Sequence, residues 1–342
     1  MVRCPAGTPA GQNRPSRRAA MAADTASTPA IPVIDLGPYL AGKPGAPEAT
    51  AAQLRHANET IGFLTIVNHG VPASLVEEAF AACARFHAQP LDAKLALRVD
   101  GEFRGYVPVR GSTTRHSRLN ADNQPNENEA YFMKRVGEDA GATDRWPAGL
   151  PGFREVALRY YAAMDALAQR LLPLYAMALD LPADWFAPHC DRPLTGLRFT
   201  HYPPARYGAN QFGLAPHADT SFITLLAQNR VPGLQLRTTD GAWIDAPVVP
   251  DSFVVNTGEV LHRWSNGRFI NTPHRAYNLS PGPRYAIPYF FHPNPDTLME
   301  PVPSCRVPGE APRYAPMTVG DYMAWFRQQN YGLSAKAKAD AA

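Results

Sequence analysis

The sequence is poor in charge and in cysteine, and it has no long apolar run. Charged residues make up 18% of the 342 residues, against about 25% in an average soluble domain. Intrinsically disordered chains have few hydrophobic residues and a high net charge. This chain has 45% hydrophobic residues, so the composition predicts a folded protein. It lacks the run of roughly 18 apolar residues that a transmembrane helix needs, so the sequence predicts no membrane partner.

The cysteines are few and far apart. Cys4, Cys83, Cys190 and Cys305 form no C-x-x-C pair. This spacing is typical of free thiols in a reducing compartment rather than of a disulfide framework. The sequence therefore predicts a cytoplasmic protein.

The formal net charge of +3 comes from the start of the chain. Residues 1–30 hold four arginines and one aspartate, and the rest of the chain holds 29 basic and 29 acidic residues. The part of the chain after residue 30 therefore has no net charge. Proteins that bind nucleic acid usually have an excess of basic residues, so we expect no nucleic-acid partner. Residues 1–30 lack the apolar stretch of a secretory signal, and although their arginines resemble those of a transit peptide, we expect a disordered tail or a true start at Met21.

The first half of the ordered chain is predicted to mix helices and strands. Residues 31–150 form an N-terminal α/β region, with strands expected at 31–36 and 62–71, helices at 48–61 and 72–86, and a long polar loop over 100–130. Residues 151–195 follow as a long supporting helix and linker. The apolar stripe of that helix is Val156, Tyr160, Met164, Leu167, Leu171 and Leu174, and Pro173 inside it predicts a kink or a break.

After residue 196 the pattern changes to short β-type runs separated by Gly, Pro, Asn and Asp. We expect strands at 197–202, 221–228, 234–237, 243–247, 252–256, 268–270, 276–279 and 285–291. Many short strands with turn punctuation favour a sandwich or jelly roll over a parallel sheet. The segment 196–295 is therefore predicted to be a jelly-roll core, and residues 296–342 a closing helix from about Thr318 followed by a tail.

Two H-x-D tripeptides are the first candidates for a metal site. His189-Cys190-Asp191 lies in a proline-bounded loop, which holds no side chain rigidly, so we expect no site there. His217-Ala218-Asp219 lies at the entrance to a predicted strand, where residues i and i+2 point to one face. A third ligand would complete a 2-His-1-carboxylate set, which leaves positions open on Fe(II) for oxygen chemistry. The histidines that could supply it are His201, His262, His274 and His292, and spacing favours His262 and His274 equally.

Several segments together resemble the isopenicillin N synthase-like family of Fe(II)/2-oxoglutarate-dependent dioxygenases. The stretches that carry the resemblance are 31–36, 62–71, 197–204, 216–226, 233–236, 256–259 and 265–275. The resemblance covers about residues 31–322. It implies a mostly β fold with flanking helices, built as a double-stranded β-helix (jelly-roll) core with a helical N-terminal region.

The resemblance also implies roles for individual residues. His217, Asp219 and His274 match the iron ligands, and His262 becomes a supporting or core histidine. Arg284 matches the arginine that holds the far carboxylate of 2-oxoglutarate, since a guanidinium fork pairs with a carboxylate and stays charged when buried. Tyr202 matches a tyrosine that reaches the same carboxylate. The implied cofactors are Fe(II), 2-oxoglutarate and O2.

The sequence departs from the family pattern after Arg284. The family usually reads Arg-x-Ser, and this chain reads Arg284-Tyr285-Ala286, which removes one hydrogen bond worth about 1 kcal/mol. Thr200 stands where many members have Asn, and we assign it no role from the resemblance. These departures leave three alternatives open: an iron and O2 oxidase that does not use 2-oxoglutarate, an ethylene-forming activity, and a non-catalytic metal-binding barrel.

The expected activity is oxidation of a C–H bond in a small organic molecule, by hydroxylation, desaturation or ring closure, coupled to conversion of 2-oxoglutarate to succinate. Substrate contacts in such sites come from loops on a rigid scaffold. The polar segment 100–135 is therefore the candidate, and we single out Arg104, Tyr106 and Phe132. Other members of that segment are Arg110, Arg115 and Glu129, and its arginines predict an acidic substrate or a solvated loop face.

Overall fold

Two β-sheets build the part of the chain that the computed structural model describes, which is residues 31–100, 102–115, 117, 119–120, 122–136 and 145–331. The larger sheet has the strand order β1 (Val33–Asp35), β2 (Phe63–Val67), β10 (Ser252–Thr257), β7 (Ile223–Gln228), β12 (Arg284–His292), β5 (Leu194–Tyr202), β4 (Glu129–Val136) and β3 (Gly105–Val107). The smaller sheet has the order β6 (Leu214–His217), β11 (His274–Ala276), β8 (Leu234–Arg237) and β9 (Trp243–Asp245). The predicted tail over residues 1–30 lies outside the described residues.

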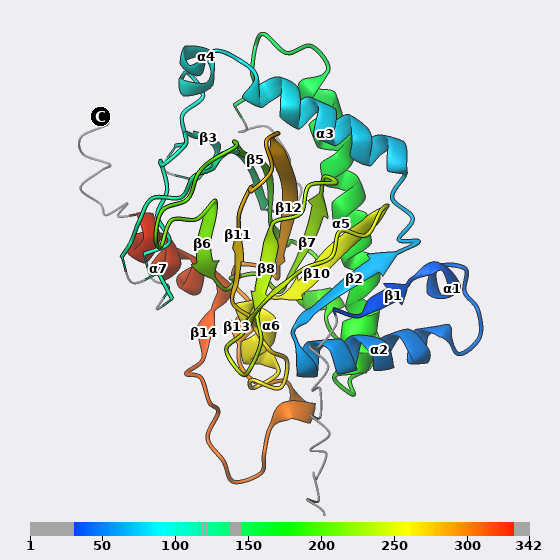
Figure 1. Ribbon diagram of the computed structural model, residues 1–342. Coiled ribbons are helices and arrows are strands. Elements are labelled where there is room, and N and C mark those ends of the chain that lie inside the picture. Colours follow the sequence, from blue (N-terminus) through cyan, green and yellow to red (C-terminus); the bar gives the residue numbers. More distant parts are fainter. Residues whose placement is uncertain are drawn as a thin grey trace, which may run out of the picture. The chain divides into compact units, whose positions relative to one another are not determined.

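The two sheets enclose an inner apolar cluster between them. Phe63 and Val254 of the larger sheet pack with Leu234 and Leu236 of the smaller one. Apart from the parallel pair of β1 and β2, the strand pairs of both sheets are antiparallel. This arrangement confirms the predicted jelly-roll core (Figure 1). Strands of the region 31–150 join the larger sheet beside those of 196–295, so these segments share one core.

The long helices cover the outer face of the larger sheet (Figure 1). The long ones are α2 (Ala46–Thr60), α3 (Ala73–His87) and α5 (Phe153–Ala178). The others are α1 (Gly37–Leu40), α4 (Leu91–Leu95), α6 (Glu259–Trp264), α7 (Val319–Tyr331) and two 3₁₀ turns at Ala187–His189 and Pro303–Cys305; a small hairpin pairs β13 (Leu298–Met299) with β14 (Met317–Thr318).

The amphipathic stripe of α5 is what holds that helix against the sheet. Its members from Tyr160 to Leu174 are buried, and Val156 packs at the edge of the core. Each such side chain contributes roughly 1.5–3 kcal/mol through burial. The helix continues without a break through Pro173, because packing of the stripe on both sides of the proline outweighs the loss of one backbone hydrogen bond.

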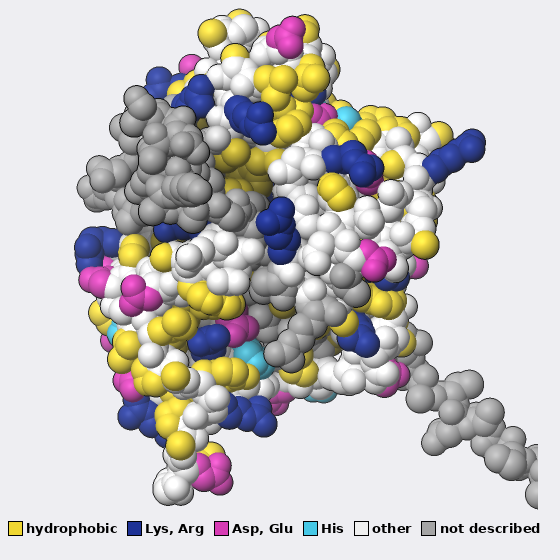
Figure 2. Space-filling model, turned by 90° about the vertical axis from the view of Figure 1, so that its left-hand side faces the viewer, with side chains coloured by type: hydrophobic (Ala, Val, Ile, Leu, Met, Phe, Trp, Pro, Cys, Tyr) yellow, Lys and Arg dark blue, Asp and Glu magenta, His cyan; other side chains and the backbone are white. Residues whose placement is uncertain are grey.

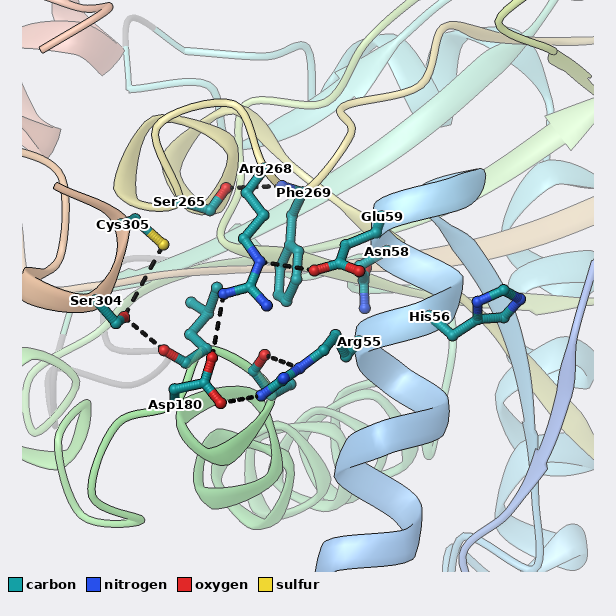
Figure 3. A network of polar contacts seen from close by, with 12 residues as sticks. Arg55, His56, Asn58, Glu59, Asp180, Ser265, Arg268, Phe269, Ser304 and Cys305 are labelled. Atoms are coloured by element: carbon teal, nitrogen blue, oxygen red, sulfur yellow. Dashed lines mark hydrogen bonds and ion pairs between the residues drawn. The ribbon is translucent and has the colours of Figure 1, made fainter. Parts of the chain in front are cut away.

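A chain of ion pairs ties α2 to the turns that follow α5 and α6 (Figure 3). Arg268 contacts Glu59 at 2.6 Å and Asp180 at 3.3 Å, and Arg55 contacts Asp180 at 2.5 Å. Arg55 also donates through Nε to the Ala178 carbonyl at 2.7 Å, which caps the C-terminus of α5. These groups are partly exposed, so each pair contributes at most about 1 kcal/mol.

Three local predictions were wrong. The predicted strand at 268–270 is a turn, because Asn266 and Gly267 both have positive φ, of 52° and 83°, and reverse the chain there. The predicted loop over 100–130 contains β3 and the first residues of β4. The strand β6 was not among the predicted strands; its Pro216 is tolerated at the edge of the smaller sheet, where a strand can lack one donor.

Candidate active site

His217, Asp219 and His274 come together between the two sheets. His217 is the last residue of β6, and His274 lies directly opposite it as the first residue of β11. Asp219 follows in the loop after β6 rather than in a strand, which corrects the predicted placement of the H-x-D pair. One ligand atom from each side chain lies within 4.8 Å of the other two. The register of β6 with β11 therefore selects His274 as the third member.

Hydrogen bonds to the backbone orient both imidazoles. His217 Nδ1 lies 2.9 Å from the Ala215 carbonyl, and His274 Nδ1 lies 3.2 Å from the Thr272 carbonyl. Each Nδ1 therefore carries the proton, and each Nε2 has its lone pair free. The two Nε2 atoms lie 3.6 Å and 3.8 Å from Asp219 Oδ1. This is the arrangement of two histidines oriented for metal binding by the other ring nitrogen.

The carboxylate of Asp219 is oriented in the same way. Its Oδ2 accepts hydrogen bonds from Thr224 Oγ1 at 2.6 Å and Asn256 Nδ2 at 2.9 Å, which leaves Oδ1 facing the histidines. Burial raises the pKa of Asp219, but His274 and His217 and these two hydrogen bonds lower it by more, so the net shift is downward. Burial and then His274 lower the pKa of His217 to about 3. An ionised carboxylate and a neutral imidazole are the forms that bind a metal ion.

A buried arginine lies on the inner face of the larger sheet, which is the face turned toward the smaller sheet. Arg284 is 1% exposed, and its guanidinium carbon lies 4.7 Å from the ring centre of Tyr202, its partner across β12 and β5. Its Nη2 donates to Gln228 Oε1 at 2.9 Å, while Nε and Nη1 have no hydrogen-bond partner among the described residues. Burial lowers the pKa of Arg284, against a raising effect of Tyr202. A buried guanidinium with unpaired donors fits a bound carboxylate.

Gly233 makes room for this arginine. Its φ is +150°, and a Cβ there would lie 2.1 Å from the Tyr277 carbonyl and 3.1 Å from Arg284 Nε. The strands that carry His274 and Arg284 do not form a hairpin, because β11 and β12 belong to different sheets. Residues 277–283 therefore cross from one sheet to the other, which places the histidine and the arginine on facing walls.

A cavity of about 180 Å³ adjoins the candidate metal ligands. Its apolar wall includes Phe103, Val107, Phe132, Leu214, Phe290, Met323 and Phe326. Its cationic lining residues are Lys134, Arg198 and Arg327, and Asp219 is the sole acidic residue among the described residues that line it. Figure 2 faces the side of the molecule on which α7 lies and shows hydrophobic side chains in a hollow, with Lys and Arg side chains nearby.

The residues singled out for the substrate do not all reach this cavity. Phe132 lines it, whereas Arg104 is paired with Asp100 at 3.1 Å. Tyr106 is buried on the outer side of the sheet and donates its hydroxyl to Glu129. Of the other members of that segment, Arg110 pairs with Glu127 at 2.5 Å and Arg115 is exposed.

The histidines that competed for the third position lie elsewhere. His262 is in α6, where its ring nitrogens bond to the Phe269 carbonyl at 2.6 Å and to the Tyr314 hydroxyl at 2.7 Å. His292 lines the cavity and bonds to the Leu194 carbonyl at 3.2 Å. In the other H-x-D tripeptide, Asp191 accepts a hydrogen bond from Asn294 at 2.6 Å.

A second histidine and glutamate cluster lies on the outer face of the larger sheet. Glu129 contacts His201 Nδ1 at 2.8 Å and His87 Nδ1 at 3.6 Å, and its other oxygen contacts Lys94 Nζ at 2.8 Å. The lysine already balances the charge of the carboxylate. A divalent cation would leave uncompensated positive charge in a buried place, so this cluster does not fit a metal.

Sequence reasoning missed Lys134, Arg198 and the α7 residues. A signal existed for Lys134, which shares a strand face with Phe132 by the two-residue period. The α7 residues are distant in sequence from every motif, and nothing in the sequence indicates that they line the cavity. Asn256 belongs to the segment 256–259, which carries part of the family resemblance, but its hydrogen bond to Asp219 follows from the fold alone.

Comparison with known proteins agrees with this geometry. Residues 193–293 match the model of the 2OG-Fe(II) oxygenase superfamily, and residues 31–149 match that of the non-haem dioxygenase in morphine synthesis N-terminal region. The 2-oxoglutarate-Fe(II) type oxidoreductase hxnY of Emericella nidulans is 32% identical over 335 residues, covering 92% of this chain and 94% of that relative.

Solved structures are similar as well. A full-length Neurospora crassa protein in complex with alpha-KG and thymine has a TM-score of 0.78 at 27% identity, covering 87% of this chain and 96% of that one. JOX2 in complex with 2OG, Fe and JA has a TM-score of 0.76 at 26% identity, covering 87% and 85%.

The chain belongs to the 2OG-Fe(II) oxygenase superfamily. It is a 2-oxoglutarate-dependent non-haem iron dioxygenase that oxidises a C–H bond of a small organic molecule, with Fe(II), 2-oxoglutarate and O2 as its cofactors and cosubstrates. This confirms the family inferred from the sequence. Among the described residues, no helix is long and apolar enough to span a bilayer.

Proposed function

We propose that this dioxygenase oxidises a small, flat organic anion held in the cavity beside His217 and Asp219. The observation that carries the proposal is the lining of that cavity, which combines aromatic side chains with three cations. In the same proposal, His217, Asp219 and His274 hold the iron, and Arg284 and Tyr202 hold the distal carboxylate of 2-oxoglutarate. The free thiols Cys83, Cys190 and Cys305 support a reducing, cytoplasmic location.

The candidate iron ligands fit the metal by the type of their donor atoms and by the hydrogen bonds that orient their side chains. Two neutral imidazoles and one carboxylate form a three-ligand face that leaves positions open, as Fe(II) oxygenases require. When bound, iron and 2-oxoglutarate supply the oxidising power, coupled to release of succinate and CO2. The protein's part is to orient the bound molecules and exclude water. Thr224 and Asn256 hold Asp219 in place.

The cations argue for a negatively charged substrate. Lys134 has no ion-pair or hydrogen-bond partner in the part of the chain that is described, and burial, followed by Arg327, lowers its pKa to about 8. Arg198 donates to Asn128 at 3.3 Å, and its Nε is buried and unpaired within the described residues. Both side chains are half-buried, and neither forms an ion pair with an acidic residue in the part of the chain that is described, so their positive field favours a negatively charged ligand. A carboxylate on the substrate supplies that negative charge.

The aromatic wall argues for a flat body. Phe132 lies edge-on to Phe103, with ring centres 5.3 Å apart, and the Arg198 guanidinium lies 4.9 Å from the ring centre of Phe132. Such surfaces favour planar groups through offset stacking and edge contacts. Thymine is a ligand of the similar Neurospora crassa protein, and a molecule of similar size suits a cavity of about 180 Å³.

The test compares matched pairs of substrates, each an aromatic carboxylic acid and its neutral carboxamide, by the succinate they release from the iron-loaded full chain. We expect the acids to stimulate release and the amides to fail. The Lys134→Gln variant should lower kcat/KM for the acids by about 10–100-fold, since a charge-assisted hydrogen bond contributes about 1.5–3 kcal/mol, and should leave KM for 2-oxoglutarate unchanged.

Two controls accompany this test. Lys43→Gln changes a lysine outside the cavity lining and should behave as the wild type. His274→Ala should lose bound iron. Equal activity with acids and amides, together with an unaffected Lys134→Gln variant, would show that the cavity does not select an anion.

A further inference from the structure

The inner face of the larger sheet has a second unpartnered donor next to Arg284. Along β5, Arg198 lines the cavity and Tyr202 contacts Arg284, so Thr200 between them points to the same inner face. Thr200 is 0% exposed, and its hydroxyl has no hydrogen-bond partner among the residues described. A buried hydroxyl without a partner is costly, which indicates that a ligand completes its bonding.

Strand register places this hydroxyl opposite an alanine. Thr200 lies directly opposite Ala286 across β5 and β12, and Gln228 lies opposite the same Ala286 across β7. Side chains of directly opposite residues start about 4.5–5.5 Å apart. Because Ala286 carries only a methyl group, β12 offers no side-chain hydrogen-bond partner to Thr200 at this position.

Gln228 is the hydrogen-bond partner of Arg284 on the neighbouring strand β7. Its Oε1 accepts the hydrogen bond from Arg284 Nη2 at 2.9 Å, which fixes the guanidinium relative to β7. The unpaired Nε and Nη1 of Arg284 and the unpaired hydroxyl of Thr200 remain. The described residues thus present several unpaired donors on one face of the larger sheet, and a carboxylate with two acceptor oxygens is a group that satisfies them.

We propose that Thr200 is a cosubstrate-binding residue, whose hydroxyl donates a hydrogen bond to the distal carboxylate of 2-oxoglutarate from across the strand pair. The hydroxyl at position 200 thereby does what a hydroxyl at position 286 could do from β12. The inference rests on the proposed role of Arg284 in holding that carboxylate, and it deepens that role by adding a neutral donor beside the charged one.

The experiment is a calorimetric titration of the Mn(II)-loaded full chain with 2-oxoglutarate, which measures affinity without turnover. The Thr200→Val variant keeps the shape and removes the hydroxyl, and we expect its affinity to fall about tenfold. Thr200→Ser should stay close to the wild type. Adding Ala286→Ser to Thr200→Val should restore most of the loss, because the new serine places a hydroxyl on the facing strand.

A matched control removes an equivalent hydroxyl elsewhere. Thr65 is 1% exposed and its hydroxyl is also unpaired within the described chain, but it lies on β2, which β10 and β7 separate from β12. Thr65→Val should leave the affinity unchanged. A second ligand, 2-oxopentanoate, has a methyl group where 2-oxoglutarate has its distal carboxylate, so its binding should not distinguish Thr200→Val from the wild type.

The outcomes separate this inference from the proposed function. If Thr200→Val binds 2-oxoglutarate as tightly as Thr65→Val while Arg284→Met loses binding, the role of Thr200 is wrong and that of Arg284 stands. If Thr200→Val weakens 2-oxopentanoate equally, the hydroxyl does not contact the distal carboxylate and the inference is again wrong. If Arg284→Met keeps full affinity, the proposed carboxylate site itself is wrong.

Discussion

Replacing Arg284 by methionine should change stability and cosubstrate affinity in opposite directions. The guanidinium is 1% exposed and has one hydrogen-bond acceptor, Gln228, among the described residues. Burying a charge costs several kcal/mol when no opposite charge compensates it, and replacing such a group by an apolar one of similar volume is often stabilising by about 1–4 kcal/mol. Without 2-oxoglutarate, Arg284→Met should therefore be more stable than the wild type by about 1–2 kcal/mol.

The affinity of Arg284→Met for 2-oxoglutarate should fall. Two charge-assisted hydrogen bonds from the guanidinium to a carboxylate, at about 1.5 kcal/mol each, amount to a loss of about 100-fold in affinity when they are removed. Gln228 is half-buried, so its freed carbonyl can turn to water and adds little to the cost. The same side chain thus weakens the unliganded fold and strengthens the liganded one.

The assay is thermal unfolding of the Mn(II)-loaded protein with and without 2-oxoglutarate. At a concentration of about 100 times Kd, the wild type gains about 2.7 kcal/mol, which raises Tm by roughly 5 °C for a chain of this size. Arg284→Met should start about 2–4 °C higher and show almost no rise at that concentration. Arg284→Lys, which keeps a charge but loses the fork, is the control.

A destabilised Arg284→Met with a full response to 2-oxoglutarate would refute the reasoning on both counts. It would mean that the guanidinium stabilises the fold as a structural group, and that the unpaired nitrogens are satisfied by something other than the cosubstrate. A loss of both stability and response would leave the binding role intact and remove the argument about the uncompensated charge.

Two further predictions concern the fold itself. Burial raises the pKa of Glu129, but hydrogen bonds from two histidines and a lysine lower it by more and hold it well below its usual range; a carboxylate with a depressed pKa stabilises the fold above its unfolded value of about 4.3. The free energy of unfolding of the wild type, measured in urea, should therefore fall as pH drops below about 4.5. Glu129→Gln should be less stable at pH 7 and should lose less stability on acidification. An equal loss of stability in the two proteins at low pH would contradict this. Gly62→Ala should cost about 3 kcal/mol in urea unfolding, because φ is +66° and a Cβ would lie 2.0 Å from the Ile270 carbonyl. Gly42→Ala, at φ +65° with open space around it, should cost about 1 kcal/mol, and equal losses at the two glycines would show that the clash is absent.

Local sequence pattern was sufficient where neighbouring residues decide the outcome. The stripe of α5 and the β-type runs after residue 196 predicted helix and jelly roll because periodicity reports directly on which face is buried. Spacing could not choose between His262 and His274, since the choice depends on the pairing of β11 with β6. Only the resemblance to a family supplied that answer.

Other parts of the site depend on contacts that sequence does not encode locally. Tyr106 looked like a loop residue, but β3 turns it outward to Glu129. Lys134 was not singled out, and it lines the cavity because β4 joins the sheet beside β5. Thr200 stood out in the sequence only as a departure from the family pattern, because an unpaired hydroxyl is visible only once the surrounding strands are in place.

The cavity draws its wall from segments of different kinds. The candidate iron ligands and Arg284 belong to strands of the two sheets and to the loop after β6, whereas Met323, Phe326 and Arg327 come from α7, the last helix of the described chain. None of the candidate metal and cosubstrate residues lies in α7, so a change in this helix alters the cavity wall and leaves those residues in place. Exchanging α7 for the corresponding helix of a relative would therefore change the shape and charge of the cavity without touching the residues proposed for the oxidising chemistry.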